Sequence, residues 1–418
     1  MSRDRCLSSL GLSAKSFFLL SLALGLSLVV LWPSVGLSHD GTLYGTSPFS
    51  EDGALAGGGT SYGLVLASEQ QFLWTCKEAV EATPYWWHRM SAERVLVGTD
   101  QGIRTSEDGG CSWSLVSGVA GSLPSLSVSV RPGNSDHLIA VTGSDSETNH
   151  VLESRDGGST WDSILSAEGA PFWRAVWSRS GEAIVAEEVR DGGRTMLHRS
   201  VDAGISWSES PKDLGEFRSV GLFGFSRDDQ SLWITALSPQ GVFVLARLAS
   251  DLSGEVEVLR MFPQLLTGFV EEEGGLLHIV VAFMDYMTWT GIPEEDPIPA
   301  DMGLASCLYE LDGLLWGCGG EPMHAQFSRR SGDGVWEELL RLDGIEPRAC
   351  PEETIAASLC PPVWDEVQTI LNPPQLDDDD EEEEPDEGCA DCAQGEGAAI
   401  ALLFVLLPLG FRRSEPRR

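Results

Sequence analysis

The chain has 418 residues, 42% of them hydrophobic, and a formal net charge of −37 at pH 7. The length suits one large all-β domain or two ordinary domains, and the apolar fraction excludes a wholly disordered chain. The acidic balance argues against nucleic acid as a partner, because phosphate groups would be repelled.

The first 38 residues have the pattern of an export signal. Basic residues precede an apolar run over residues 17–32, and Pro33 ends that run shortly before the small residues Gly36 and Ser38. We expect a signal peptidase to cleave near Ser38. The alternative is an uncleaved membrane anchor, because this apolar run approaches the length of the shortest membrane spans.

Three octapeptides in the middle of the chain share the pattern S-x-D-x-G-x-x-W. Their tryptophans lie 48 and 46 residues apart, and each octapeptide follows short apolar runs separated by turn residues. A repeat of this length, with about four short strands in each unit, is typical of a β-propeller blade. The pattern residues are Ser106, Asp108, Gly110, Trp113, Ser154, Asp156, Gly158, Trp161, Ser200, Asp202, Gly204 and Trp207.

Weaker copies extend the repeat in both directions. They occur at residues 66–74, 249–256 and 327–336, and a unit near residue 300 keeps the strands but lacks the octapeptide. The expected closing positions are Trp74, Trp113, Trp161, Trp207, Val256, a lost one near residue 300, and Trp336. These units predict an all-β fold, a single β-propeller over residues 39–345 with seven four-stranded blades; six or eight blades are the alternatives.

The octapeptide resembles the Asp-box (BNR) repeat of sialidases, sortilin-type receptors, photosystem assembly factors and some glucanases. The resemblance implies that each octapeptide forms the turn between the third and fourth strands of a blade. Elementary chemistry agrees, because Asp accepts hydrogen bonds from nearby backbone N–H groups, Gly supplies a positive φ, and Trp buries a large ring between blades. We therefore interpret Asp156 as a turn residue and not as a catalytic carboxylate.

The resemblance to sialidases would imply an arginine triad, a tyrosine–glutamate pair and an acid/base aspartate. The sequence contains no F/Y-R-I-P segment for the first arginine, and none of its five tyrosines has an evident glutamate partner. We therefore expect no catalytic residues. The alternative is a sialidase-like or other glycoside hydrolase whose site lies in the central depression of the propeller.

A short aromatic segment is the candidate ligand-binding site. Trp86, Trp87 and Arg89, together with His88, could stack on a sugar ring. The alternative is an inner strand that packs its aromatic rings against a neighbouring blade. No histidine or cysteine spacing supports zinc, and the acidic segment 285–303 matches no calcium loop, so we expect neither a metal nor a cofactor.

Six cysteines lie between the two ends of the chain, an even number that suits disulfides in an oxidising compartment. One pair flanks a Leu-Asp-Gly turn and can face each other across a hairpin. A second pair would close a short loop and clip a C-terminal cap over residues 346–372, and a third follows by elimination. The expected pairs are Cys307–Cys318, Cys350–Cys360 and Cys76–Cys111.

Two segments follow the cap. Residues 373–388 form an acidic linker, which we expect to be extended and disordered because its charges repel one another. Residues 389–418 combine a two-cysteine motif, an apolar run and an arginine cluster. This tail resembles C-terminal sorting signals of the myxobacterial (MYXO-CTERM) type, which implies recognition, processing and retention at the cell surface. A plain membrane anchor is the alternative.

The sequence therefore predicts an exported, cell-surface propeller with hydrophobic helices at both ends, held at the membrane through its C-terminal segment. We expect a non-catalytic binding or scaffolding module. Its expected partner is a cell-surface protein or a glycan.

Overall fold

The computed structural model describes residues 45–68, 71–281, 286–292, 295–299, 306–319, 326–332, 334–341 and 344–371. The expected signal peptide, acidic linker and C-terminal tail, with both hydrophobic segments, lie outside these residues. Among the helices that are described, none is long and apolar enough to cross a membrane.

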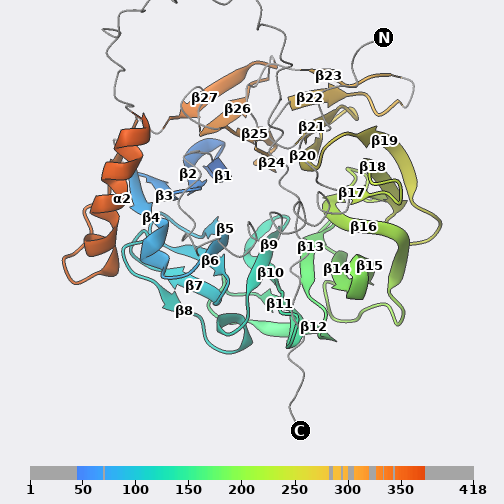
Figure 1. Cartoon of the computed structure of the whole chain (residues 1–418), viewed down its shortest axis with the longest axis horizontal. Helices are drawn as coiled ribbons and strands as arrows, with labels where there is room; N and C mark the ends of the chain where they lie inside the picture. Colours follow the sequence, from blue (N-terminus) through green and yellow to red (C-terminus); the bar gives the residue numbers. More distant parts are fainter. Residues whose placement is uncertain are drawn as a thin grey trace, which may run out of the picture. The chain divides into compact units, whose positions relative to one another are not determined.

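The described strands form six sheets arranged around a common axis in a propeller-like ring (Figure 1). In each of the first three sheets the first strand lies nearest the axis, and the chain proceeds outwards in an antiparallel meander. The first sheet contains β1 (Gly45–Glu51), β2 (Ala54–Thr60), β3 (Gly63–Ala67) and β4 (Phe72–Cys76). The second contains β5 (Pro84–Arg89), β6 (Val95–Thr99), β7 (Gly102–Ser106) and β8 (Ser114–Leu115). The third contains β9 (Ser125–Arg131), β10 (Asn134–Thr142), β11 (Thr148–Ser154) and β12 (Asp162–Glu168).

The fourth sheet has seven strands because one long strand belongs to two successive meanders. These strands are β13 (Phe172–Trp177), β14 (Ile184–Arg190), β15 (Arg194–Ser200), β16 (Lys212–Phe225), β17 (Ser231–Leu237), β18 (Phe243–Ala249) and β19 (Glu257–Phe262). The first part of β16 pairs with β15 and its last part with β17. Strand β16 is therefore the outer strand of one meander and the inner strand of the next.

The last two sheets repeat the four-stranded pattern. The fifth contains β20 (Leu266–Glu271), β21 (Leu277–Val281), β22 (Tyr286–Trp289) and β23 (Ile298–Pro299). The sixth contains β24 (Cys307–Leu311), β25 (Leu314–Cys318), β26 (Phe327–Arg330) and β27 (Trp336–Leu340). Short 3-10 helices span Lys77–Val80, Val119–Gly121 and Asp191–Gly193.

Apolar side chains fill the spaces between neighbouring sheets. Leu64 of β3 and Val97 of β6 belong to one buried cluster, and Leu96 of β6 shares another with Leu138 of β10. The two faces of β6 thus pack against different neighbours. This is why the strands read as short apolar runs and do not alternate strictly between polar and apolar residues.

Each of the three octapeptides forms the turn between the third and fourth strands of its unit. Asp156 accepts hydrogen bonds from the hydroxyl of Ser154 at 2.9 Å, from the backbone N–H of Thr160 at 2.9 Å and from the Thr160 hydroxyl. The Ser154 hydroxyl in turn accepts a bond from the N–H of Gly158 at 2.7 Å. Corresponding bonds surround Asp108 and Asp202. The carboxylate therefore closes the turn upon itself, as expected for Asp156.

Backbone conformation distinguishes the third turn from the other two. The residue that follows the pattern aspartate has a positive φ in all three turns, and it is Gly109 and Gly157 in the first two but Ala203, with φ of 55°, in the third. A residue with a Cβ is strained in this left-handed region. Replacing Ala203 with glycine is expected to raise the free energy of unfolding by about 0.5–1 kcal/mol, since the strain removed exceeds the entropy that glycine adds to the unfolded chain. Denaturant titration measures the change, and an unchanged or lowered unfolding midpoint for A203G would contradict the prediction. The reciprocal variant, G157A, is expected to lower the midpoint.

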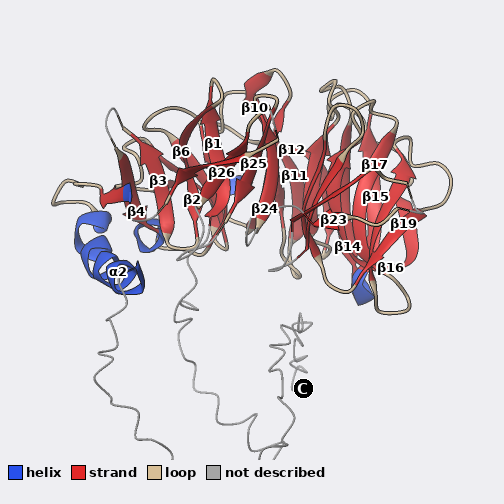
Figure 2. Ribbon diagram, turned by 90° about the horizontal axis from the view of Figure 1, so that it is seen from above, coloured by secondary structure: helices blue, strands red, loops and turns tan. Residues whose placement is uncertain are grey.

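The C-terminal part of the described chain returns to the first sheet. Strand β28 (Ile345–Pro347) pairs in parallel with β4, and helix α2 (Ile355–Leu371) packs against the same sheet. Figure 2 shows α2 at the rim of the ring beside β4. The Trp364 ring of α2 lies 5.2 Å from that of Trp74, and Val367 belongs to the same buried cluster.

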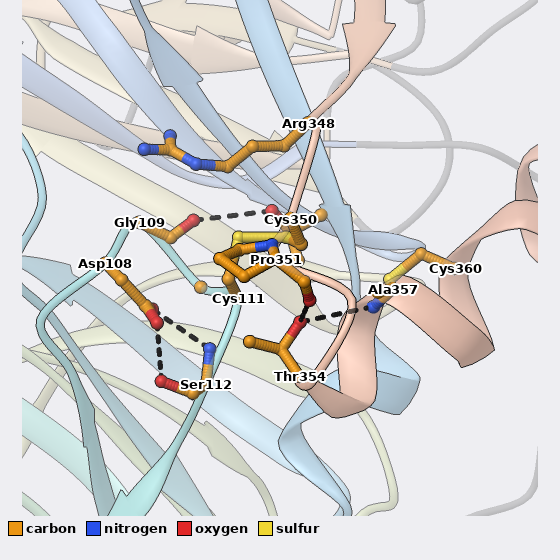
Figure 3. Close-up of a disulfide and its surroundings, with 12 residues drawn as sticks. Asp108, Gly109, Cys111, Ser112, Arg348, Cys350, Pro351, Thr354, Ala357 and Cys360 are labelled. Carbon is orange, nitrogen blue, oxygen red and sulfur yellow. Dashed lines mark hydrogen bonds between the residues drawn. A yellow bond between two sulfur atoms is a disulfide. The ribbon is translucent and has the colours of Figure 1, made fainter.

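Two disulfides fasten this returning segment. Cys76, the last residue of β4, is bonded to Cys360 of α2, and Cys111 of the first octapeptide is bonded to Cys350 (Figure 3). The expected pairs Cys76–Cys111 and Cys350–Cys360 were wrong, because proximity in sequence does not reveal that the chain end comes back to the beginning of the ring. The third expected pair, Cys307–Cys318, is confirmed across the β24–β25 hairpin. Three disulfides indicate an exported protein.

Candidate functional site

In five inner strands, the second residue is left out of the pairing with the neighbouring strand. In β5, Pro84 pairs with Thr99 and Trp86 with Gly98, so that Tyr85 is left out of the ladder. In β13, Trp173 is left out in the same way. The five bulged residues are Thr46, Tyr85, Leu126, Trp173 and Thr267. A bulge bends the strand and redirects the extra side chain.

Two of the bulged residues are large exposed aromatics. Tyr85 is 50% exposed and Trp173 is 55% exposed. The meander in each of the first three sheets contains four strands, so β1, β5, β9 and β13 begin at the same end of the ring, which we call the leading end. Strand β9 contacts both β5 and β13, so the two rings belong to inner strands separated by one neighbour. The leading end thus carries two aromatic side chains around the axis.

The structure does not support the binding role of Trp86, Trp87 and Arg89. The two tryptophans are 8% and 6% exposed and belong to clusters between neighbouring sheets. Arg89 pairs with Glu51 at 2.9 Å, and burial lowers the pKa of His88 to about 4. The alternative, an inner strand that packs its aromatic rings against neighbouring blades, therefore describes this segment, because both faces of β5 are covered by neighbouring sheets.

At the opposite end of the inner strands, which we call the trailing end, ion pairs join side chains from different meanders. Glu310 of β24 accepts one hydrogen bond from Arg179 at 2.8 Å and another from Arg227 at 2.7 Å. These arginines follow β13 and β16, so the cluster joins three meanders. Glu271 of β20 accepts hydrogen bonds from the indole of Trp233 and from the backbone N–H of Arg227, both at 2.9 Å. Both carboxylates thus form contacts that join neighbouring parts of the ring.

A buried carboxyl lies between β13 and β16. Glu187 of β14 is 1% exposed, and its Oε2 accepts a hydrogen bond from the N–H of Leu222 at 3.3 Å, whereas its Oε1 has no partner within the described residues. Arg174 donates to the carbonyl of Leu222 at 2.9 Å. Burial raises the pKa of Glu187 to about 7, although the nearby charge of Arg174 opposes that shift. The side chain is sealed from solvent.

The carboxyl groups of Glu310, Glu271 and Glu187 are held in contacts within the fold. A glycoside hydrolase needs two reachable carboxyl groups about 5–10 Å apart. Glu310 and Glu271 are already hydrogen-bonded to arginine and tryptophan side chains, and Glu187 is buried. Among the described residues no group of three His, Cys, Asp or Glu side chains is placed to hold a metal ion.

The sequence pattern did not single out Tyr85 or Trp173 as exposed aromatic residues. Tyr85 is the direct neighbour of Trp86, and the bulge leaves Tyr85 out of the strand pairing. A weak signal was present, because both exposed rings belong to a Pro-aromatic-Trp sequence, PYW at residues 84–86 and PFW at residues 171–173.

Comparison with known proteins supports the fold alone. No protein-family model and no curated protein matches the chain. Among solved structures, an ancestral GH74 enzyme is similar over 72% of this chain, with 12% identity and a TM-score of 0.50. A GH74 enzyme of Niastella koreensis is 11% identical over 71% of this chain, with a TM-score of 0.46. YCF48 bound to D1 peptide is 15% identical over 68% of this chain and 88% of its own, with a TM-score of 0.42.

The chain spans about half the length of the GH74 enzymes, 47% and 54% respectively. The likeness to the ancestral GH74 enzyme and the ring of sheets identify a β-propeller fold, and disulfides stabilise it.

Proposed function

We propose that this protein is an exported Asp-box propeller of seven four-stranded blades that acts at the cell surface as a non-catalytic binding or scaffolding module. Its ligand, a glycan or a cell-surface protein, contacts the leading end of the ring through Tyr85 and Trp173. The observation that carries this proposal is the exposure of both rings on bulged inner strands. Aromatic rings bind sugars and proteins through large, rigid contact areas.

The blade count rests on the shared strand β16. Counting the seven-stranded sheet as two blades gives seven blades together with the other five sheets of the described chain. Each octapeptide then lies between the third and fourth strands of its blade, as the Asp-box resemblance implies.

Attachment at the cell surface rests on the C-terminal sequence and is compatible with the disulfides. Helix α2, which precedes the acidic segment, is bonded to β4 through Cys360. In this proposal the chain is retained through its MYXO-CTERM-type tail, and force applied to the tail reaches the first sheet through that disulfide. Helix α2 would then serve as the mechanical junction between propeller and membrane.

Glycan-array binding by the full chain tests the proposed site. Removing both rings, in Y85A/W173A, is expected to weaken binding of any glycan that the parent protein retains by about tenfold or more, because each aromatic contact contributes on the order of 1 kcal/mol. The variant Y85F/W173F keeps both rings and is expected to bind nearly as the parent does. Unchanged binding by Y85A/W173A would contradict the proposed site.

A glycoside hydrolase is the second candidate, because the octapeptide resembles the Asp-box repeat that also occurs in sialidases and some glucanases. Product analysis in the same experiment distinguishes the two. Release of sugar by the parent protein would replace the binding proposal with catalysis, whereas retention without release supports a binding module.

A further inference from the structure

A cavity lies near the third octapeptide, between it and the turn that follows β18. Its volume is about 500 Å³, within the range of about 300–1,000 Å³ that is usual for small-molecule sites. Three serines line it together with Arg199, Val201, Trp207, Lys212, Asp251 and Leu252.

The cavity exists where the third octapeptide departs from the other two. Strands β8 and β12 begin directly after Trp113 and Trp161. In the third unit, residues 208–211 intervene between Trp207 and β16, which begins at Lys212. Ser208 still donates its N–H to the carbonyl of Arg199 at 2.8 Å, and Ser208, Ser210 and Pro211 of this segment line the cavity beside Trp207.

Two N–H donors at the cavity have no partner among the described residues. The indole Nε1 of Trp113 and that of Trp161 each donate to a glycine carbonyl at 3.0 Å, whereas the corresponding nitrogen of Trp207 is buried without a partner. The Nε of Arg199 is likewise buried without a partner. Both nitrogens are covered by the protein, so the rest of each side chain, and not these two atoms, lines the cavity.

The charge and composition of the lining indicate which kind of ligand this cavity would bind. Arg199 and Lys212 bring two positive charges against the one negative charge of Asp251, in a chain whose net charge is −37. Lys212 donates one hydrogen bond, to the carbonyl of Gly254 at 2.7 Å, and an ammonium group has three donors. Serine hydroxyls and an indole beside these cations suit a ligand that has hydroxyl groups, an apolar ring face and an anionic group.

We propose that this cavity binds a carboxylate-bearing sugar residue, such as a uronic acid unit of a polysaccharide. The carboxylate is bound by Arg199 and Lys212, the serines bind ring hydroxyls, and Trp207 contacts the sugar ring. The site is separate from Tyr85 and Trp173, so it does not depend on the function proposed for the leading end.

Binding of matched oligosaccharides to the full chain tests this. Oligogalacturonate is expected to bind more tightly than the neutral galactose oligomer of equal length, because only its carboxylates can pair with Arg199 and Lys212. R199A and K212A are each expected to weaken oligogalacturonate binding about tenfold, because each removes a charge-assisted hydrogen bond. R199K is expected to retain only part of the affinity, since lysine cannot reproduce the planar fork of arginine.

Two controls keep the test specific. Arg247 is an exposed arginine that pairs with Glu257 outside the cavity, so R247A removes the same charge and is expected to bind as the parent does. Y85A/W173A is expected to leave this binding unchanged, which separates it from the leading-end site. Equal binding of both oligomers, no oligogalacturonate binding at millimolar concentration, tighter binding of an acidic peptide or inorganic phosphate, or equal losses in R199A and R247A would each overturn the proposal.

Discussion

Replacing Cys76 and Cys360 with serine is expected to lower the free energy of unfolding by about 3–4 kcal/mol. This bond joins residues 284 positions apart, and a cross-link over so long a loop removes much conformational freedom from the unfolded chain. The effect stays below that for an isolated loop of this length, because Cys111–Cys350 still ties the same segments together. Loss of the bond also releases α2, whose Trp364 packs on Trp74. Guanidinium denaturation of the oxidised proteins measures the change.

Two further variants give this prediction its controls. Removing Cys307–Cys318, which spans 11 positions, is expected to cost less, about 2–3 kcal/mol by the same loop-length relation. Removing Cys111–Cys350 together with Cys76–Cys360 is expected to cost more than either alone, and to make α2 the first site of cleavage in limited proteolysis. The account fails if the hairpin variant proves the least stable of the three, or if the midpoint of the Cys76–Cys360 variant matches that of the parent.

Replacing Glu187 with glutamine is expected to stabilise the protein increasingly as the pH rises. The pKa of this carboxyl is about 7 in the folded chain against an ordinary value of 4.5, so the unfolded state ionises first. The free energy of unfolding of the parent therefore falls between pH 4.5 and 7 and levels off above, by on the order of 3 kcal/mol for a shift of this size. Glutamine does not ionise and lacks this loss.

Thermal or denaturant unfolding at pH 4.5 and pH 8 measures the difference between parent and E187Q. The two proteins are expected to be similar at pH 4.5 and well separated at pH 8. E346Q changes an exposed glutamate and is the matched control, for which no such divergence is expected. A gap between parent and E187Q that stays constant with pH would show that Glu187 does not carry the shift.

Local chemistry made several features predictable from sequence alone. The turn around Asp156 is closed by hydrogen bonds to residues no more than four positions away, so an octapeptide contains all that it needs. The Cys307–Cys318 bond joins directly paired residues of one hairpin. The repeat spacing predicted a propeller, because each unit of about four strands must bury its faces against the next.

Closure of the ring determined contacts between distant segments that the sequence did not reveal. Cys76 and Cys111 find Cys360 and Cys350 because the chain end returns to the first sheet, and no local pattern encodes that meeting. The ion pairs at Glu310 likewise join side chains from distant meanders.

The exposed aromatic rings depended on register. The bulge leaves Tyr85 out of the strand pairing and exposed, whereas Trp86 and Trp87 lie on opposite faces of β5, and each is buried against a different neighbouring sheet. The repeated turns, the propeller and its hairpin disulfide were thus determined by sequence, because their contacts are local or periodic. Tertiary structure decided the Cys76–Cys360 and Cys111–Cys350 disulfides and the candidate binding surface, since they depend on which distant strands meet and in which register.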